Sequence, residues 1–236
     1  MHLMRASTPP PPSRTPSAAS AALGSGVLTG VLLVLVAVEW APLIALDRAV
    51  AETLHESAVR SPGLTRANRV LTDWVWDPWT MRALLAVTAL WLWWRRERTA
   101  ALWVAGAGVV GAAVQQALKA AVGRERPDWP DPVDSAHFAA FPSGHAMTAV
   151  VAFGLLLWLL ARYGADRRGW WAVAVIGAVS VLGVGLTRVY LGVHWATDVL
   201  GGWLLGGCVV AVAVLTYERR AVPRGSAARE AGRSGR

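Results

Sequence analysis

The chain has 236 residues, of which 55% are hydrophobic and only 16% are charged, and its formal net charge is +8. This composition excludes an ordinary soluble domain, because the apolar residues gather in long blocks. It does not indicate nucleic-acid binding either, because the arginines stand in short clusters beside those blocks, where membrane topology and anionic lipid head groups account for their charge. The expected partners are membrane lipids and no nucleic acid.

Six apolar blocks predict helices that cross a membrane, because each is close to the ~20 residues needed to span ~30 Å of hydrocarbon. Lipid offers no partner to backbone polar groups, so each span is expected to be an α-helix. The expected spans are 23–46, 80–94, 100–119, 145–163, 169–187 and 196–217, of which the second is the shortest. The predicted fold class is all-α, a bundle of six transmembrane helices.

The two ends of the chain differ in composition from the spans. Residues 1–20 are rich in Pro, Ser, Thr and Ala, and residues 218–236 alternate Arg with small residues. Neither segment can bury a core, so both are expected to be disordered tails around one membrane domain over 21–217. In the connection 47–79, apolar residues at helical spacing predict a short helix on the membrane surface, on which His55 is expected to be solvated.

The connections between the spans predict the orientation, since Lys and Arg are in excess on the cytoplasmic side of membrane proteins. Arginines concentrate in both tails and in the second and fourth connections, around Arg95 and Arg167. Both termini are therefore expected in the cytoplasm, and the connections 47–79, 120–144 and 188–195 outside. The predicted location is the cytoplasmic membrane, which the chain crosses several times.

Three polar clusters interrupt the apolar chain, each at the outward end of a predicted span. The first contains Lys119, the only lysine of the chain, and Arg126, which precedes a proline. The two cations are seven residues apart, about two helical turns, so on a continuing helix they would share a face and converge. Taken alone, they could equally be interfacial cations whose side chains reach toward the head groups.

The second cluster is the run Pro142, Ser143, Gly144 and His145. Pro142 disfavours a helix through it, Ser143 is a preferred N-cap, and the residues after His145 are apolar as far as Tyr163. His145 is therefore expected in the first turn of a helix, where free N–H groups and the helix dipole suit an anion such as phosphate. The alternative is that His145 only caps the helix.

The third cluster runs from Thr187 to Asp198 and includes Arg188 and His194. His194 and Asp198 have i,i+4 spacing, so the carboxylate can accept a hydrogen bond from one imidazole nitrogen and leave the other free as a nucleophile or base. A purely structural hydrogen bond is the alternative. Taken together, the three clusters favour a phosphate cradle with acid–base groups over three unrelated structural roles.

In their order and spacing, the three clusters resemble the type-2 phosphatidic acid phosphatase superfamily. Its signature is a Lys followed by Arg-Pro, then Pro-Ser-Gly-His, then Ser-Arg with a distal His and Asp. The resemblance covers residues 119–198, and Thr187 stands where the family usually has Ser. The six-span layout extends the resemblance to about 23–217, and the predicted orientation puts the expected active site at the extracytoplasmic ends of the helices.

The resemblance also implies the roles of the site residues. His194 would attack phosphorus to give a phosphohistidine, and Asp198 would orient it. His145 would protonate the leaving oxygen and later activate water. The equatorial oxygens would be held by Lys119, Arg126, Ser143, the Gly144 N–H and Arg188. This division agrees with the needs of phosphoryl transfer, which are in-line positioning and neutralisation of spread negative charge.

No metal or other cofactor is expected, because three cations can supply the charge that a metal supplies elsewhere. Asp128, Asp131 and Asp134 with His137 could suggest a metal site, but a solvated acidic loop is favoured. The predicted function is a metal-independent membrane phosphatase acting on a lipid phosphate or diphosphate, of the polyprenyl diphosphate or phosphatidate type. The alternatives are a lipid phosphotransferase, or a catalytically silent scaffold or transporter. The sequence predicts no oligomeric state.

Overall fold

The computed structural model describes residues 15–221, which form eight α-helices and one π-helical turn. They are α1 (Thr15–Ala37), α2 (Ala41–Arg60), α3 (Pro62–Val70), the turn η1 (Leu71–Val75), α4 (Pro78–Trp94), α5 (Arg98–Val122), α6 (Gly144–Arg162), α7 (Arg167–Tyr190) and α8 (Ala196–Ala221). Two tails were expected to be disordered, and most of each, 1–14 and 222–236, lies outside the described residues. The helices α1 and α8 extend several residues beyond the expected domain of 21–217.

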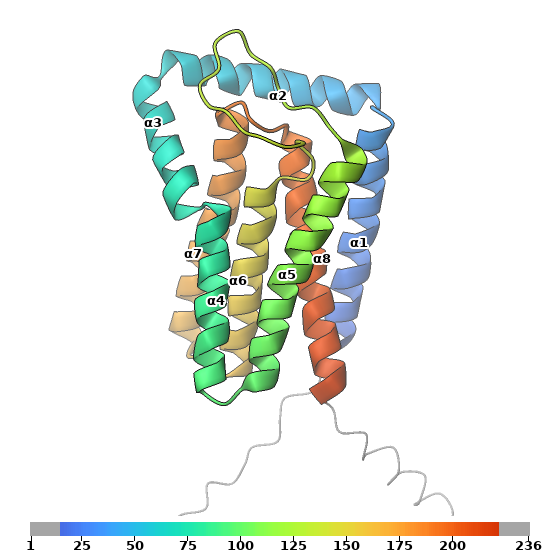
Figure 1. The fold of residues 1–236 in the computed structure, drawn as a ribbon, viewed down its shortest axis with the longest axis vertical. Coiled ribbons are helices and arrows are strands. Elements are labelled where there is room, and N and C mark those ends of the chain that lie inside the picture. Colours follow the sequence, from blue (N-terminus) through green and yellow to red (C-terminus); the bar gives the residue numbers. More distant parts are fainter. Residues whose placement is uncertain (1–14, 222–236) are drawn as a thin grey trace, which may run out of the picture.

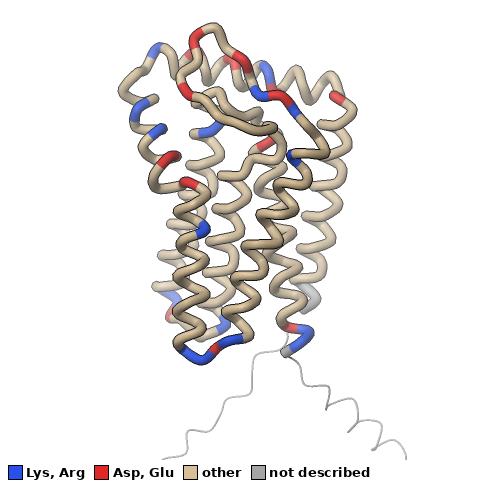
Figure 2. The backbone as a smooth tube through the Cα atoms, viewed as in Figure 1, with Lys and Arg blue, Asp and Glu red and all other residues tan. Residues whose placement is uncertain are grey.

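The long helices run side by side, and α2 lies across one end of the bundle they form (Figure 1). The beginning of α1 and the end of α8 lie at the opposite end. The connection between α5 and α6 folds over the same end as α2. Acidic and basic residues gather at the two ends and leave most of the shaft uncharged (Figure 2). This distribution is expected of a bundle whose middle lies in hydrocarbon.

Among residues 15–221, five helices are long and apolar enough to cross a membrane, namely α1, α5, α6, α7 and α8. Apolar side chains are also exposed on their outer surfaces, for example Val27, Val31 and Val34 of α1. The protein is therefore an all-helical, multi-pass membrane protein. The expected span 80–94 lies in α4, which has 17 residues and at 1.5 Å per residue rises only about 26 Å. It packs against α5 and α6 within the bundle (Figure 1).

The first span ends earlier than expected, at Ala37 instead of residue 46. The chain turns at Glu39, whose φ is +49°, and Pro42 stands in the first turn of α2. Since proline is favoured at the start of a helix and disfavoured inside one, it begins the new helix here. Residues 41–46 therefore belong to the helix across the bundle end and not to the span.

One face of α2 is buried against the bundle, and it carries Asp47, Ala51, His55 and Ala58. The prediction that His55 is solvated is wrong. Its ring stacks on Trp129 of the α5–α6 connection, with ring centroids 4.2 Å apart. The spacing alone placed His55 among the polar residues of α2, because nothing in the local sequence indicates that the later connection covers it.

Close packing of α8 against α6 sets the geometry of the site. A Cβ at Gly202 would lie 2.6 Å from the Ser143 carbonyl oxygen, and one at Gly206 would lie 2.9 Å from the Met147 carbonyl oxygen. Both contacts are closer than a side chain permits, so glycine allows the two backbones to approach. The Ser143 N–H donates to the Asp198 carbonyl at 2.9 Å. The start of α6 and the start of α8 are thereby joined.

Candidate active site

The three polar clusters come together at the bundle end covered by α2 and the α5–α6 connection. They are contributed by the end of α5, the start of α6, the end of α7 and the start of α8. The His145 ring lies within electrostatic range of Arg188, His194, Arg126 and Lys119. The structure thus brings all the predicted charged residues into one cluster. Their chemical roles stay predictions.

The His194 side chain is held on both sides. It is 2% exposed, and its Nδ1 lies 3.3 Å from Oδ2 of the fully buried Asp198. Its Nε2 lies 3.2 Å from Nη1 of Arg126. Burial lowers the pKa of His194 well below its usual value, and the Arg126 cation lowers it further. The imidazole is therefore neutral at physiological pH, with the proton on the nitrogen that faces the carboxylate and a lone pair on Nε2.

Arg126 does not lie on a continuing helix with Lys119, as the spacing argument assumed. The helix α5 ends at Val122, and Gly123 terminates it in the left-handed conformation with φ +61°. Such a position favours glycine, because other residues are strained there. The connection then turns back, so that Arg126 reaches the cluster from the loop while Lys119 reaches it from the last turn of α5.

Arg126 is surrounded by backbone carbonyls. Its Nε donates to the Phe138 oxygen at 2.9 Å, Nη2 donates to the His137 oxygen at 3.1 Å, and Nη1 donates to the Val193 oxygen. Burial and the nearby Arg188 lower the pKa of Arg126 to about 10. The guanidinium therefore remains charged at neutral pH. Its partners are neutral, so its positive charge is available to an anion.

The other two cations also contact the α5–α6 connection. Lys119 donates through Nζ to the Ala139 carbonyl oxygen. Nη1 of Arg188 lies 3.7 Å from Oδ2 of Asp134, and Nε of Arg188 is buried without a partner among residues 15–221. All three predicted phosphate-binding cations are buried or half-buried under this connection. The carbonyl and carboxylate oxygens of the connection occupy N–H donors of these cations that a phosphate would otherwise use.

The second cluster has the predicted local structure. The helix α6 begins at Gly144, which puts His145 in the first turn, and Ser143 is the N-cap residue. The Ser143 side chain makes no capping hydrogen bond, however, and its buried hydroxyl has no partner among the described residues. A Cβ at Gly144 would lie 2.5 Å from Nε2 of Gln115, so a larger residue at this position would force the Gln115 side chain of α5 to move. The Ser143 hydroxyl can therefore donate to an anion at the start of α6.

The acidic α5–α6 connection contains the residues that could suggest a metal site, Asp128, Asp131, Asp134 and His137. Among residues 15–221, no three His, Cys, Asp or Glu side chains are grouped closely enough to hold a metal ion. Asp134 faces Arg188 instead. Metal independence stays a prediction.

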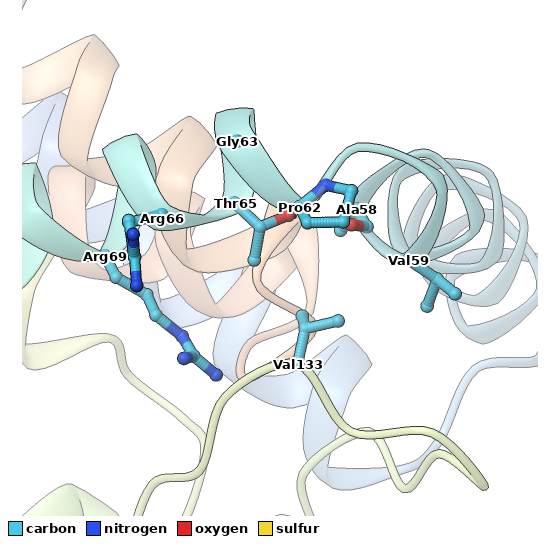
Figure 3. Close-up of a pocket in the computed structure, with 8 residues that line it drawn as sticks. All are labelled: Ala58, Val59, Pro62, Gly63, Thr65, Arg66, Arg69 and Val133. Carbon is cyan, nitrogen blue, oxygen red and sulfur yellow. Dashed lines mark hydrogen bonds between the residues drawn. The ribbon is translucent and has the colours of Figure 1, made fainter.

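Two cavities open near this end of the molecule. One, of about 430 Å³, is formed where α2 meets α3 and includes Arg66, Arg69 and Val133 (Figure 3). The other, of about 750 Å³, lies between α2 and the α5–α6 connection beside Arg124 and Trp195. Neither cavity is lined by His145 or His194. His194 is buried, whereas His145 is half-buried outside both cavities.

Sequence reasoning missed three residues at the site. The sequence patterns assigned no role to Arg124 or Asp47, and Thr197 fell within the third cluster without a role of its own. The structure joins Arg124 to both Asp47 and Asp198, at 2.7 and 2.6 Å. One signal was present, because Asp47 shares a helical face with Ala51 and Ala58, and an acid on an apolar face needs a partner.

Comparison with known proteins identifies relatives of this arrangement. The model of the PAP2 superfamily matches residues 100–221. Phosphatidylglycerophosphatase B of Bacillus subtilis is 38% identical over 95 residues, which cover 39% of this chain and 46% of the relative. Undecaprenyl-diphosphatase of Sulfolobus acidocaldarius is 31% identical over 146 residues, or 58% of this chain and 61% of the relative.

A longer match is found to decaprenylphosphoryl-5-phosphoribose phosphatase of Mycobacterium tuberculosis, which is 34% identical over 170 residues, covering 70% of this chain and 86% of the relative. The matches to the first two relatives span about half of their length. The crystal structure of a transmembrane PAP2-type phosphatidylglycerolphosphate phosphatase from Bacillus subtilis has a TM-score of 0.73 and 23% identity, covering 86% of this chain and 98% of that one. The two proteins share a fold.

Proposed function

Because the chain belongs to the PAP2 superfamily, we propose that it is a membrane phosphatase that hydrolyses a lipid phosphate or diphosphate through a phosphohistidine on His194. One observation carries this proposal. The buried His194 presents one nitrogen to Asp198 and the other to the cations, with Arg126 3.2 Å from Nε2. A neutral imidazole with its lone pair directed toward an anion-binding cluster is suited to attack phosphorus.

In the first step, Nε2 of His194 attacks phosphorus in line with the leaving oxygen. The N–P bond forms as the P–O bond breaks, and His145 gives its proton to the departing oxygen. The proton on Nδ1 remains, so the ring carries a positive charge, which the Asp198 carboxylate stabilises. This step requires His145 to be protonated at the start, and a phosphate dianion that enters among the cations favours that form.

In the second step, water attacks the phosphohistidine. His145 accepts a proton from the water as the O–P bond forms and the N–P bond breaks. Inorganic phosphate then leaves, with His145 protonated for the next cycle. The same group acts as acid and then as base, as microscopic reversibility requires. Through both steps, three cations stabilise the negative charge on the phosphoryl oxygens, namely Lys119, Arg126 and Arg188. The Ser143 hydroxyl and the Gly144 N–H at the start of α6 donate further hydrogen bonds to these oxygens.

Binding of the substrate requires the α5–α6 connection to release the cations. The carbonyls of residues 137–139 and the Asp134 carboxylate now accept their hydrogen bonds or lie against them. Phosphoryl oxygens would replace these acceptors. Since a phosphate carries more negative charge than a carbonyl, the exchange favours the ligand once it has lost its water.

The substrate is proposed to be a lipid because the cluster lies at the ends of the spanning helices. A phosphate there would be at head-group depth while its hydrocarbon chain stays in the bilayer. The named relatives support polyprenyl and phosphatidate-type lipids as the candidate classes. The arginine distribution supports six spans, with α4 as the sixth, and a site on the outer face of the cytoplasmic membrane.

The proposal is tested with the full chain purified in detergent. Phosphate release is measured from a panel of phosphatidate, phosphatidylglycerophosphate, polyprenyl monophosphate and polyprenyl diphosphate. We expect turnover of at least one of them. Arg60→Ala is the matched control for variants, because the Arg60 side chain is exposed and pairs only with exposed Glu56 at 3.5 Å. Release from none of the panel, by a monodisperse protein, would contradict the proposal.

A further inference from the structure

The Asp198 carboxylate has partners besides His194. Its Oδ2 accepts a hydrogen bond from the Trp195 N–H at 2.9 Å and faces His194 Nδ1, whereas its Oδ1 accepts one from Nη1 of Arg124 at 2.6 Å. The carboxylate is completely buried. Two fixed donors and the histidine therefore determine its orientation, and Arg124 is the only charged one of the two donors.

Arg124 is itself held from the other side. Its Nη2 donates to Oδ2 of Asp47 at 2.7 Å, and its Nη1 also donates to Oγ1 of Thr197 at 2.7 Å. Asp47 further accepts hydrogen bonds from the N–H and the hydroxyl of Thr197, the former at 3.0 Å. Thr197 lies in the first turn of α8, where backbone N–H groups have no helical partner. Asp47 thus fastens both Arg124 and the turn that carries Asp198.

The charges in this network are arranged in a row. Asp47, Arg124 and Asp198 carry −1, +1 and −1, so the row has a net charge of −1 beside the His194 ring. If Arg124 were paired with Asp198 alone, its positive charge would offset the negative charge that stabilises the cationic His194 ring. Because Asp47 also pairs with Arg124 and offsets its charge, the negative charge of Asp198 remains available to the ring. Removal of Arg124 from the middle would leave two buried carboxylates uncompensated, which is strongly destabilising for that arrangement.

We propose that Arg124 is a positioning residue for the nucleophile, anchored by Asp47. It holds the Asp198 carboxylate against Nδ1 of His194, so that Nε2 is the nitrogen left free to attack phosphorus, and it does so without touching the substrate. This inference rests on the proposed function, because it assigns a part in phosphohistidine formation. It also assigns a catalytic purpose to α2, a helix outside the three motifs.

The first test replaces Arg124 by Gln and by Lys, with Arg60→Ala as the control. For Arg124→Gln we expect kcat to fall by ~10–100-fold, by analogy with the loss of a group that orients a metal-binding histidine. The KM for the lipid phosphate and the inhibition constant for inorganic phosphate should change less than about twofold, since Arg124 binds neither. Arg124→Lys should lie between the wild type and Arg124→Gln, because lysine keeps the charge but cannot bridge two carboxylates in the same way.

Arg188→Ala is the comparison variant, since Arg188 is placed in the phosphate site. It should raise the inhibition constant for inorganic phosphate severalfold. If Arg124→Gln raises that constant as much, Arg124 is a phosphate ligand and the inference is overturned. If Arg124→Gln retains the wild-type kcat, the inference is overturned as well.

A double-mutant cycle tests the part of Asp47. Asp47→Asn should lower kcat in the wild-type background and lower it no further in Arg124→Gln, because Asp47 acts through Arg124. Independent, additive losses would overturn the assignment of Asp47.

Activity is expressed per active enzyme, counted from the burst of phosphoenzyme. If the loss disappears under this normalisation, the network serves only folding and the inference fails. Should Arg124→Gln not fold, Arg124→Lys and Asp47→Asn give the same contrast between kcat and phosphate binding.

The same experiments separate failure of the inference from failure of the proposed function. If His194→Ala still turns over, the phosphohistidine proposal fails and the inference with it. If His194→Ala is inactive and the wild type forms phosphoenzyme while Arg124→Gln does so at the wild-type rate, only the inference fails.

Discussion

The His194 ring is fixed between Asp198 and Arg126, whereas the His145 ring has no hydrogen-bond partner among residues 15–221. His194 is almost completely buried, while His145 is half-buried in the first turn of α6. The difference fits the two tasks that we propose. A nucleophile gains from one tautomer and one orientation, whereas a group that donates a proton to one oxygen and then accepts one from another must meet two partners.

The largest effect should come from the fixed histidine. His194→Ala should abolish turnover of every substrate and any acid-labile phosphoenzyme, because no other group is placed to form the bond to phosphorus. Rapid acid-free quenching with labelled substrate measures the phosphoenzyme directly. If phosphoenzyme still forms in His194→Ala, His194 is not the nucleophile and the contrast drawn between the two histidines is wrong.

A smaller effect, which depends on the substrate, should come from replacement of His145. His145→Ala should slow hydrolysis of a lipid monophosphate by ~10²–10⁴-fold, the range of general acid catalysis, because an alkoxide is a poor leaving group. It should slow p-nitrophenyl phosphate much less, since p-nitrophenolate leaves without a proton. The measurement is the ratio of the two rates in His145→Ala and in the wild type. An equal loss for both substrates would mean that His145 is not the acid of the first step.

The Asp134 carboxylate offers a way to sharpen the comparison, because it occupies Arg188 from the solvent side of the cluster. Asp134→Asn should lower the KM for the lipid phosphate by about two- to fivefold, the equivalent of the ~0.5–1 kcal/mol of a partly exposed ion pair. The kcat should not change. Asp131→Asn, an exposed acid of the same connection, is the control for net charge. A KM that rises in Asp134→Asn would show that the ion pair organises the site instead of competing with the substrate.

The smallest expected effect is that of chelation. Phosphate release should be the same in excess EDTA as without it, because Lys119, Arg126 and Arg188 supply the positive charge at the phosphoryl group. The assay compares initial rates before and after dialysis against the chelator. A loss that Mg²⁺ or Mn²⁺ restores would make the acidic connection a metal site and the cations insufficient.

Local features of the chain were predictable because their causes are local. The N-cap at Ser143 and the i,i+4 pair of His194 and Asp198 depend on neighbours within one helical turn, and both lie where their spacing predicted. The positions of five spans followed from hydropathy in the same way. The convergence of Lys119 and Arg126 was argued for a continuing helix, and that condition is not met because Gly123 ends α5.

The sequence by itself determined that the chain is a helical membrane protein and which polar residues lie at the ends of its helices, because hydropathy and caps act over a few residues. Only the tertiary structure decided that His55 is buried, that loop carbonyls hold Arg126, and that Asp47 reaches Thr197 across 150 positions of the chain. Such contacts depend on how helices far apart in sequence pack. A single sequence contains the residues that make these contacts but does not show which of them are in contact.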